Sequence, residues 1–232
     1  MKLKYAILSF LLCLCAGAFS QSEVETPNYD EIKMSTFDKN SPLYYPKLMN
    51  RFMECDTTLT LEDYRSLYYG FVFQEDYNPY RVSPYSLKVK EYATQDATNS
   101  IDCDSIISYG LKAMDDFPFD IRTMNMLVYA YQCTNNETEK LKWSYKLKGI
   151  IDAIISSGDG EEEASAFHVI YAPHEYELLL RFGLSAKSTQ IMDTNFDYIE
   201  VESNKFNVKG YFFNILKLRE VFHSKFNETV IQ

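Results

Sequence analysis

Residues 100–133 read SIDCDSIISYGLKAMDDFPFDIRTMNMLVYAYQC, and this stretch decides the predicted fold. Apolar residues recur at helical spacing in its first half and again after Pro118. Asp102 and Asp104 suit the positive end of a first helix, and Asp120 can cap a second one. The stretch therefore predicts two helices joined by a short turn, which is a helical hairpin.

Helical patterns continue on both sides of this hairpin. Before it, Thr60 followed by Asp63 is typical of an N-terminal cap. After it, a third helix is predicted from Asn136 through Ile155. The hairpin has about the length of a tetratricopeptide unit, but too few such units fit, because stacked repeats need about three to bury a continuous core. We therefore expect repeat-like helix packing over residues 21–157, and not a solenoid.

The pattern changes period after the acidic linker predicted at residues 158–165. A short apolar run at 166–171 is followed by a helix with Pro173 in its first turn. Three strand-like segments come next, at 187–192, 196–202 and 208–213. With a last helix, residues 166–232 form a unit of strand, helix, three strands and helix. The predicted fold class is α+β, with a helical, tetratricopeptide-like region packed on this small unit.

The first twenty residues have the pattern of a secretory signal peptide, because two lysines precede an apolar stretch at 5–14 and small residues follow it. Ala18 and Ser20 suit the positions that the peptidase reads, so we predict cleavage after Ser20. Lipidation at Cys13 or Cys15 is the alternative, although a leucine precedes each. No later segment reaches 18 uninterrupted apolar residues, so no membrane span is predicted in the mature chain.

Three cysteines follow the predicted cleavage site: Cys55, Cys103 and Cys133. If the hairpin helices are antiparallel, Cys103 and Cys133 lie equally far from residue 118 and can form a disulfide in an oxidising compartment. Three buried thiols are the alternative. The sequence has no CxxC pair, no Cys/His cluster and no zinc spacing, so it predicts no metal site and no cofactor.

Composition limits the possible partners. The 232 residues are 46% hydrophobic and 16% aromatic, which excludes a disordered chain. Lys and Arg number 23 against 33 Asp and Glu, a net charge of −10, so nucleic acid is not an expected partner. Together with the signal peptide, these values predict an acidic protein that is exported to the periplasm or secreted.

Four titratable side chains within ten residues are the best candidates for catalysis: His168, His174, Glu175 and Glu177. Imidazole and carboxylate groups together can form an acid–base pair or a metal site. However, the segment lacks the second histidine of an HExxH motif, and adjacent residues point about 100° apart on a helix. The alternative is that Glu175 stabilises a helix N-terminus beside a solvated His174. The sequence alone therefore assigns no catalytic residue.

A loop rich in tyrosine and proline, at residues 74–85, offers candidates for binding. Tyr77, Tyr80 and Tyr85 can form a surface because tyrosine combines an apolar ring with a polar tip. The alternative is a tyrosine-rich core.

Several segments carry a resemblance to a known family. They are NSPLYYPKLM at 40–49, LTLEDYRSLYYG at 59–70, QEDYNPY at 74–80, HEYE at 174–177 and GYFFN at 210–214. In this order they resemble a domain-of-unknown-function family of secreted Bacteroidetes-type proteins, over residues 29–214. The resemblance implies an exported protein of a Gram-negative cell envelope, and it implies no activity and no catalytic residue.

Two functions are consistent with these observations. The first is a non-catalytic binding or assembly module of the cell envelope, with an envelope protein or a glycan as partner. The second is a hydrolase that acts on a glycan or peptide and uses the His and Glu residues of segment 168–177. A pocket holding two of those side chains within hydrogen-bond reach would favour the hydrolase, and a groove lined by the three tyrosines would favour binding.

Overall fold

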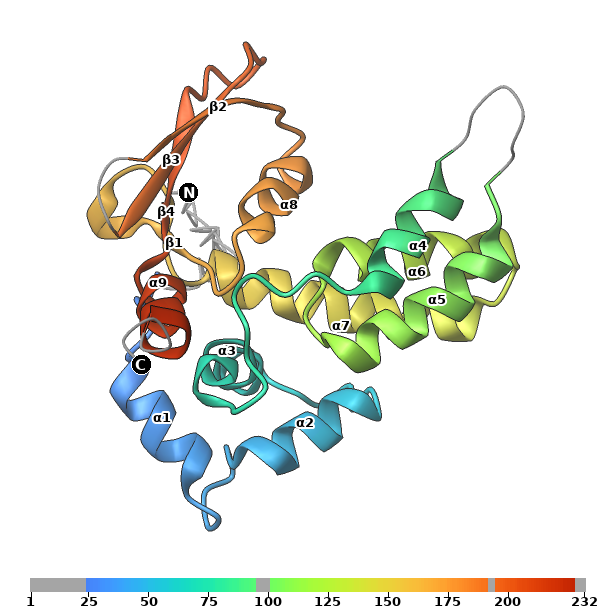
Figure 1. Cartoon of the computed structure of the whole chain (residues 1–232), viewed down its shortest axis with the longest axis horizontal. Helices are drawn as coiled ribbons and strands as arrows, with labels where there is room; N and C mark the ends of the chain where they lie inside the picture. The colour runs from blue at the N-terminus through green and yellow to red at the C-terminus, as the bar shows by residue number, and fades with distance from the viewer. Residues whose placement is uncertain (1–23, 95–100, 192–194, 228–232) are drawn as a thin grey trace, which may run out of the picture.

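Helices form the N-terminal part of the computed structural model, which describes residues 24–94, 101–191 and 195–227, and a small sheet lies near its C-terminal end (Figure 1). The N-terminal helices are α1 Tyr29–Phe37, α2 Tyr45–Met53, α3 Leu61–Gly70, α4 Pro84–Ala93, α5 Cys103–Asp116, α6 Ile121–Cys133 and α7 Glu137–Ile155. The C-terminal elements are β1 Phe167–His168, α8 Pro173–Arg181, β2 Ala186–Ile191, β3 Phe196–Val201, β4 Gly210–Asn214 and α9 Leu216–Phe222. The predicted α+β class and the order strand, helix, three strands, helix are confirmed. The predicted signal peptide, residues 1–20, lies outside the described residues.

Polar caps set where the helices begin, and those of α3, α6 and α7 lie at the predicted positions. The side chains of Asp102 and Asp120 each accept a hydrogen bond of 3.0 Å from the backbone N–H three residues later, at the start of α5 and α6. At the start of α7, the Asn136 side chain accepts a hydrogen bond of 3.2 Å from the backbone N–H of Glu139. Thr60 and Asp63 form a reciprocal capping box at α3. Local sequence therefore decides these boundaries.

Close helix packing joins the N-terminal helices. Contacts join α4 to α5, α5 to α6 and α6 to α7, and α7 also contacts α3. A Cβ atom on Gly149 of α7 would lie 2.2 Å from the Tyr64 ring of α3. Only glycine permits this approach, so Gly149 fixes how near α7 and α3 can lie.

The sheet has the strand order β1-β4-β3-β2. Strand β1 pairs with β4 in parallel over two residues, and the other neighbours are antiparallel. Phe167 of β1 lies opposite Phe213 of β4, and both side chains are buried. Strand β2 forms the other edge and is exposed along its whole length. The edge of the sheet at β1 is therefore buried next to the helices, whereas the edge at β2 is exposed.

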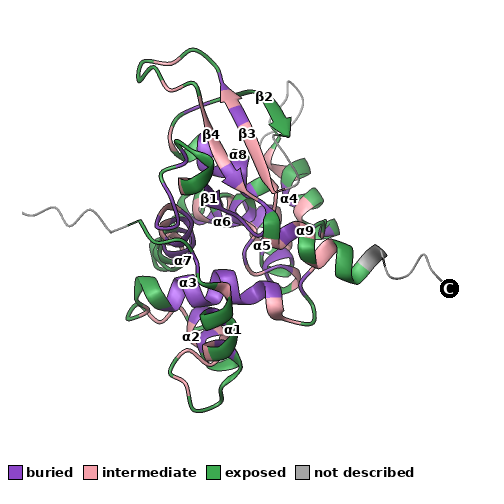
Figure 2. Cartoon of the chain, turned by 90° about the vertical axis from the view of Figure 1, so that its left-hand side faces the viewer, coloured by how far each residue is buried: buried purple, intermediate pink, exposed green. Residues whose placement is uncertain are grey.

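One hydrophobic core includes residues from both parts of the chain (Figure 2). Ile32, Leu127 and Ile154 come from the helices, and Phe213 comes from the sheet. Its largest fully buried side chains include Tyr68, Tyr69 and Tyr77. The helices and the sheet therefore share apolar surface that neither part could bury alone.

Segment 158–165, predicted as an acidic linker, is tied into the structure by hydrogen bonds. The Oδ1 atom of Asp159 accepts from the backbone of Glu161 at 2.9 Å and from the Ser165 hydroxyl at 2.5 Å. The backbone N–H of Phe212, in β4, donates to the Gly160 carbonyl at 2.8 Å. The segment is a turn held against the sheet, with its acidic side chains from Glu161 onward exposed.

Candidate functional site

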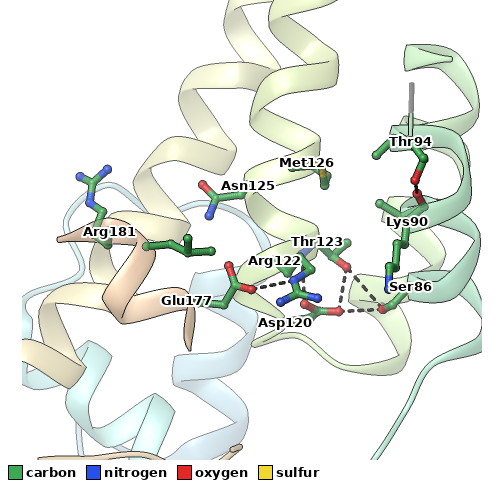
Figure 3. Close-up of a pocket in the computed structure, with 13 residues that line it drawn as sticks. Ser86, Lys90, Thr94, Asp120, Arg122, Thr123, Asn125, Met126, Glu177 and Arg181 are labelled. Atoms are coloured by element: carbon green, nitrogen blue, oxygen red, sulfur yellow. Dashed lines mark hydrogen bonds and ion pairs between the residues drawn. The ribbon is translucent and has the colours of Figure 1, made fainter. Parts of the chain in front are cut away.

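A groove of about 610 Å³ lies between α4, α6 and α8 (Figure 3). It is lined by Ser86, Val89, Lys90, Ala93 and Thr94, by Asp120, Arg122, Thr123, Asn125 and Met126, and by Glu177, Leu180 and Arg181. On each helix these residues recur at a spacing of three or four, so each helix turns one face toward the groove. The volume lies within the range of about 300–1,000 Å³ that is usual for small-molecule sites.

Asp120 organises one wall of the groove. Its Oδ2 atom accepts hydrogen bonds of 2.7 Å from the hydroxyl groups of Ser86 and Thr123, and its Oδ1 atom accepts from the Thr123 backbone. Figure 3 shows this network linking the start of α6 to α4. The Asp120 carboxylate therefore serves as a cap and as a link between two helices.

An ion pair joins the other two walls. The Nε atom of Arg122 donates to Oε1 of Glu177 at 2.6 Å. The Glu177 side chain is 5% exposed and that of Arg122 is 55% exposed. The pair therefore connects α6 to α8 and leaves the guanidinium accessible from solvent.

Two further cations line the groove. Lys90 on α4 and Arg181 on α8 are both exposed. Within the part of the chain that the structure describes, neither side chain forms an ion pair. The groove therefore presents positive charge from all three of its helices.

Glu177 is the one member of the predicted His/Glu set that lines this groove. His174 lies in the core, 1% exposed, between the Tyr68 hydroxyl at 2.7 Å and the Phe119 carbonyl at 2.8 Å. Because a carbonyl can only accept, Nε2 of His174 donates to Phe119 and Nδ1 accepts from Tyr68. Burial lowers the pKa of His174 to about 4, so its ring is neutral. The expectation of a solvated His174 is wrong, because the start of α8 packs into the aromatic core.

His168 and Glu175 are buried as well. Burial lowers the pKa of His168 to about 4, and its Nδ1 atom has no hydrogen-bond partner among the described residues. Glu175 is 1% exposed, and burial, with a further contribution from Asp197, raises its pKa to about 9. Its carboxyl group is therefore protonated at neutral pH. Within the described chain no hydrogen bond joins any two of the four predicted residues, and Glu177 alone among them lines the groove.

The three loop tyrosines are separated from one another. Tyr77 is 1% exposed, and its hydroxyl donates to the Ile170 carbonyl at 2.5 Å. Tyr80 is 51% exposed and packs edge-on against the Phe222 ring. Tyr85 is also exposed and lies near the Lys112 ammonium. Tyr77 thus belongs to the core, and none of the three lines the groove.

The structure joins Cys103 and Cys133 in a disulfide, with their Cα atoms 6.4 Å apart at the open end of the α5–α6 hairpin. Cys55 is a free thiol. Among residues 24–94, 101–191 and 195–227, no group of three His, Cys, Asp or Glu side chains is placed to hold a metal ion. In the same ranges no helix is both long and apolar enough to cross a membrane.

Most of the groove goes beyond what local sequence patterns predict. They predict Asp120 as a cap and do not indicate Lys90, Arg122 or Arg181. The spacing of Val89, Lys90 and Ala93 on one face of α4 was the available signal. The pairing of Arg122 with a residue 55 positions away leaves no local pattern, so it could not be predicted.

A family model described as a domain of unknown function, DUF4919, matches residues 30–224. The chain belongs to the DUF4919 family. The resemblance to a family of unknown function is thereby confirmed, while the Bacteroidetes-type origin of this DUF4919 chain stays a prediction. No curated protein and no solved structure matches it significantly.

Proposed function

We propose that the DUF4919 chain is an exported, non-catalytic binding module and that the groove between α4, α6 and α8 is its ligand site. The observation that carries this proposal is the groove itself. It combines an apolar part, formed by Val89, Ala93, Met126 and Leu180, with a few convergent charged groups. This composition is typical of sites that bind small molecules.

The lining favours binding over catalysis. No histidine is among the residues that line the groove, and its three hydroxyl groups already donate within the protein: those of Ser86 and Thr123 donate to the Asp120 carboxylate, and that of Thr94 donates to the Lys90 carbonyl. A general acid or base must reach the substrate. The buried positions of His168, His174 and Glu175 therefore give the hydrolase alternative little support.

Export is supported by the sequence pattern of residues 1–20 and by the paired positions of Cys103 and Cys133. The export part of this proposal predicts that the exported chain begins at Gln21. An envelope location would give the groove access to molecules of the periplasm or the cell surface.

A fluorescent probe tests the groove as a binding site. N-phenyl-1-naphthylamine is neutral and apolar, and its emission rises in an apolar site. We expect saturable binding at one site per chain. Ala93→Phe, which fills the groove, should abolish this binding, whereas Leu87→Phe should not, because Leu87 lies on α4 outside the groove and is 57% exposed.

The melting temperatures of both variants should be close to that of the wild type. Loss of probe binding by Ala93→Phe then reflects the filled groove and not an unfolded protein. If the wild type binds no probe, or if Ala93→Phe and Leu87→Phe bind it equally well, the groove is not the ligand site.

A further inference from the structure

The groove carries an excess of positive charge in an acidic protein. Lys90, Arg122 and Arg181 line it together with two carboxylates, Asp120 and Glu177. The chain as a whole has a net charge of −10. Both carboxylates are already engaged, one by hydroxyl and backbone donors and the other by Arg122. The charge that remains to attract a ligand is therefore positive.

Arg122 presents a free hydrogen-bonding edge. Only its Nε atom bonds to Glu177, and among the described residues its two terminal nitrogens have no hydrogen-bond partner. The two terminal N–H groups of a guanidinium match the two oxygens of a carboxylate. Glu177 is a positioning residue in this arrangement, because it is buried and fixes the side chain of Arg122 from α8.

The remaining lining is aliphatic and not aromatic. No tyrosine, phenylalanine or tryptophan lines the groove, although these residues make up 16% of the chain. Stacking on a sugar ring uses aromatic side chains, so this lining does not favour a glycan. An extended peptide is recognised through free backbone groups at a strand edge. The lining residues lie in helices or at their ends, where most backbone groups are already paired.

We infer that the groove binds an acyl carboxylate, with the carboxylate on the terminal nitrogens of Arg122 and the aliphatic chain against Val89, Met126 and Leu180. This inference rests on the proposed binding function. Lys90 and Arg181 flank the site and attract the anionic head group. Leu180 is 61% exposed, and a bound chain would cover it.

Calorimetry with two matched amphiphiles tests the inference. Dodecanoate and dodecanol share one aliphatic chain and differ in the charge of the head group. Both are titrated below the concentration at which they form aggregates. We expect dodecanoate to bind at least about tenfold more tightly than dodecanol, because a charge-assisted pair adds affinity of that order. The difference should shrink at high salt.

Variants locate the head group. Arg122→Lys keeps the positive charge and loses the paired N–H groups of the guanidinium. It should lower the affinity for dodecanoate about tenfold and leave the affinity for dodecanol unchanged. The double variant Lys90→Gln/Arg181→Gln changes exposed side chains only and should weaken dodecanoate severalfold. The matched control Lys39→Gln/Lys47→Gln removes two exposed lysines outside the groove and should leave the affinity for both amphiphiles unchanged.

The outcomes separate the two proposals. Equal binding of dodecanol and dodecanoate would overturn the inference and keep the groove as a binding site. Binding of neither, together with no binding of the naphthylamine, would overturn the proposed function as well. Tighter binding of an N-acetylated Leu-Leu-Ala peptide with a free carboxylate would assign the site to peptide ends and overturn the acyl assignment.

Discussion

The α5–α6 hairpin and the buried segment 167–175 are held by different kinds of hydrogen bond. In the hairpin, the capping side chains Asp102 and Asp120 bond to residues three positions away. In the buried segment, the Tyr68 hydroxyl reaches the His174 ring, 106 positions further along the chain. The hairpin can therefore form from local sequence, whereas the buried segment is fixed only when distant parts of the core come together.

Tyrosine hydroxyl groups replace strand pairing in the buried segment. Strand β1 pairs with β4 over two residues only, so the backbone beyond it needs other partners. The Tyr77 hydroxyl donates to the Ile170 carbonyl, and the Tyr68 hydroxyl accepts from the Ile170 N–H. The Tyr69 hydroxyl lies between the Ala153 carbonyl at 3.1 Å and the His168 carbonyl at 3.4 Å. A phenylalanine core would fill the same space and leave these backbone groups unpaired.

The largest effect is expected in the hairpin, at the disulfide. Cys103 and Cys133 enclose a segment with a separation of 30 residues, and closing such a loop stabilises a fold by about 3 to 4 kcal/mol. In denaturant unfolding, the free energy of unfolding of Cys103→Ser/Cys133→Ser should be lower than that of the wild type by this amount. The exported chain should begin at Gln21, have a mass two hydrogens below that of the reduced form, and contain one titratable thiol, that of Cys55.

Two controls accompany this experiment. Cys55→Ser should unfold like the wild type, and reductant should destabilise the wild type but not the double variant. Three titratable thiols in the exported chain would show that the bridge is absent. The hairpin would then depend on packing alone.

A slightly smaller effect is expected in the buried segment, at Glu175. Its pKa rises from the ordinary value of 4.5 to about 9 in the folded chain. As the pH rises above about 4.5, the unfolded chain loses this proton while the folded chain keeps it, so stability falls until about pH 9. Glu175→Gln removes the loss and should be more stable than the wild type by about 3 kcal/mol at pH 7. The gain should vanish below about pH 4.

Glu177→Gln is the matched control, since it makes the same chemical change two residues further along α8. Glu177 forms an ion pair with Arg122, whose side chain is 55% exposed, so its replacement should give no gain and a small loss. Both variants should still lose stability from about pH 6.5 to 4, because His168 and His174 are neutral in the fold and take up protons on unfolding. A Glu175→Gln curve parallel to that of the wild type would show that Glu175 is ionised in the folded chain.

The same contrast explains what could be predicted from the sequence. Helix starts at Thr60, Asp120 and Asn136 were predictable because a cap and its partner lie three residues apart. The cluster His168, His174, Glu175 and Glu177 is a candidate from the sequence because its members are close together, although their spacing assigns no catalytic residue. Burial by aromatic side chains from α3 and from the 117–119 turn separates them, and this contact between distant segments has no local signal. The pairing of Arg122 with Glu177 in the groove has no local signal for the same reason.

The smallest effect is expected at the loop tyrosines, where one hydroxyl group is removed at a time. Tyr77→Phe keeps the ring in the core and leaves the Ile170 carbonyl without its 2.5 Å donor. An unpaired buried carbonyl costs about 1 to 2 kcal/mol, which a shift in the denaturant midpoint can measure. Tyr80→Phe, at a ring that is 51% exposed, should change stability by less than about 0.5 kcal/mol. Amide exchange in the 168–171 segment should quicken in Tyr77→Phe alone, while exchange in α5 and α6 stays the same. Equal effects of the two variants would mean that the tyrosine hydroxyls do not hold the buried segment, and that packing of the rings fixes it as it fixes the hairpin.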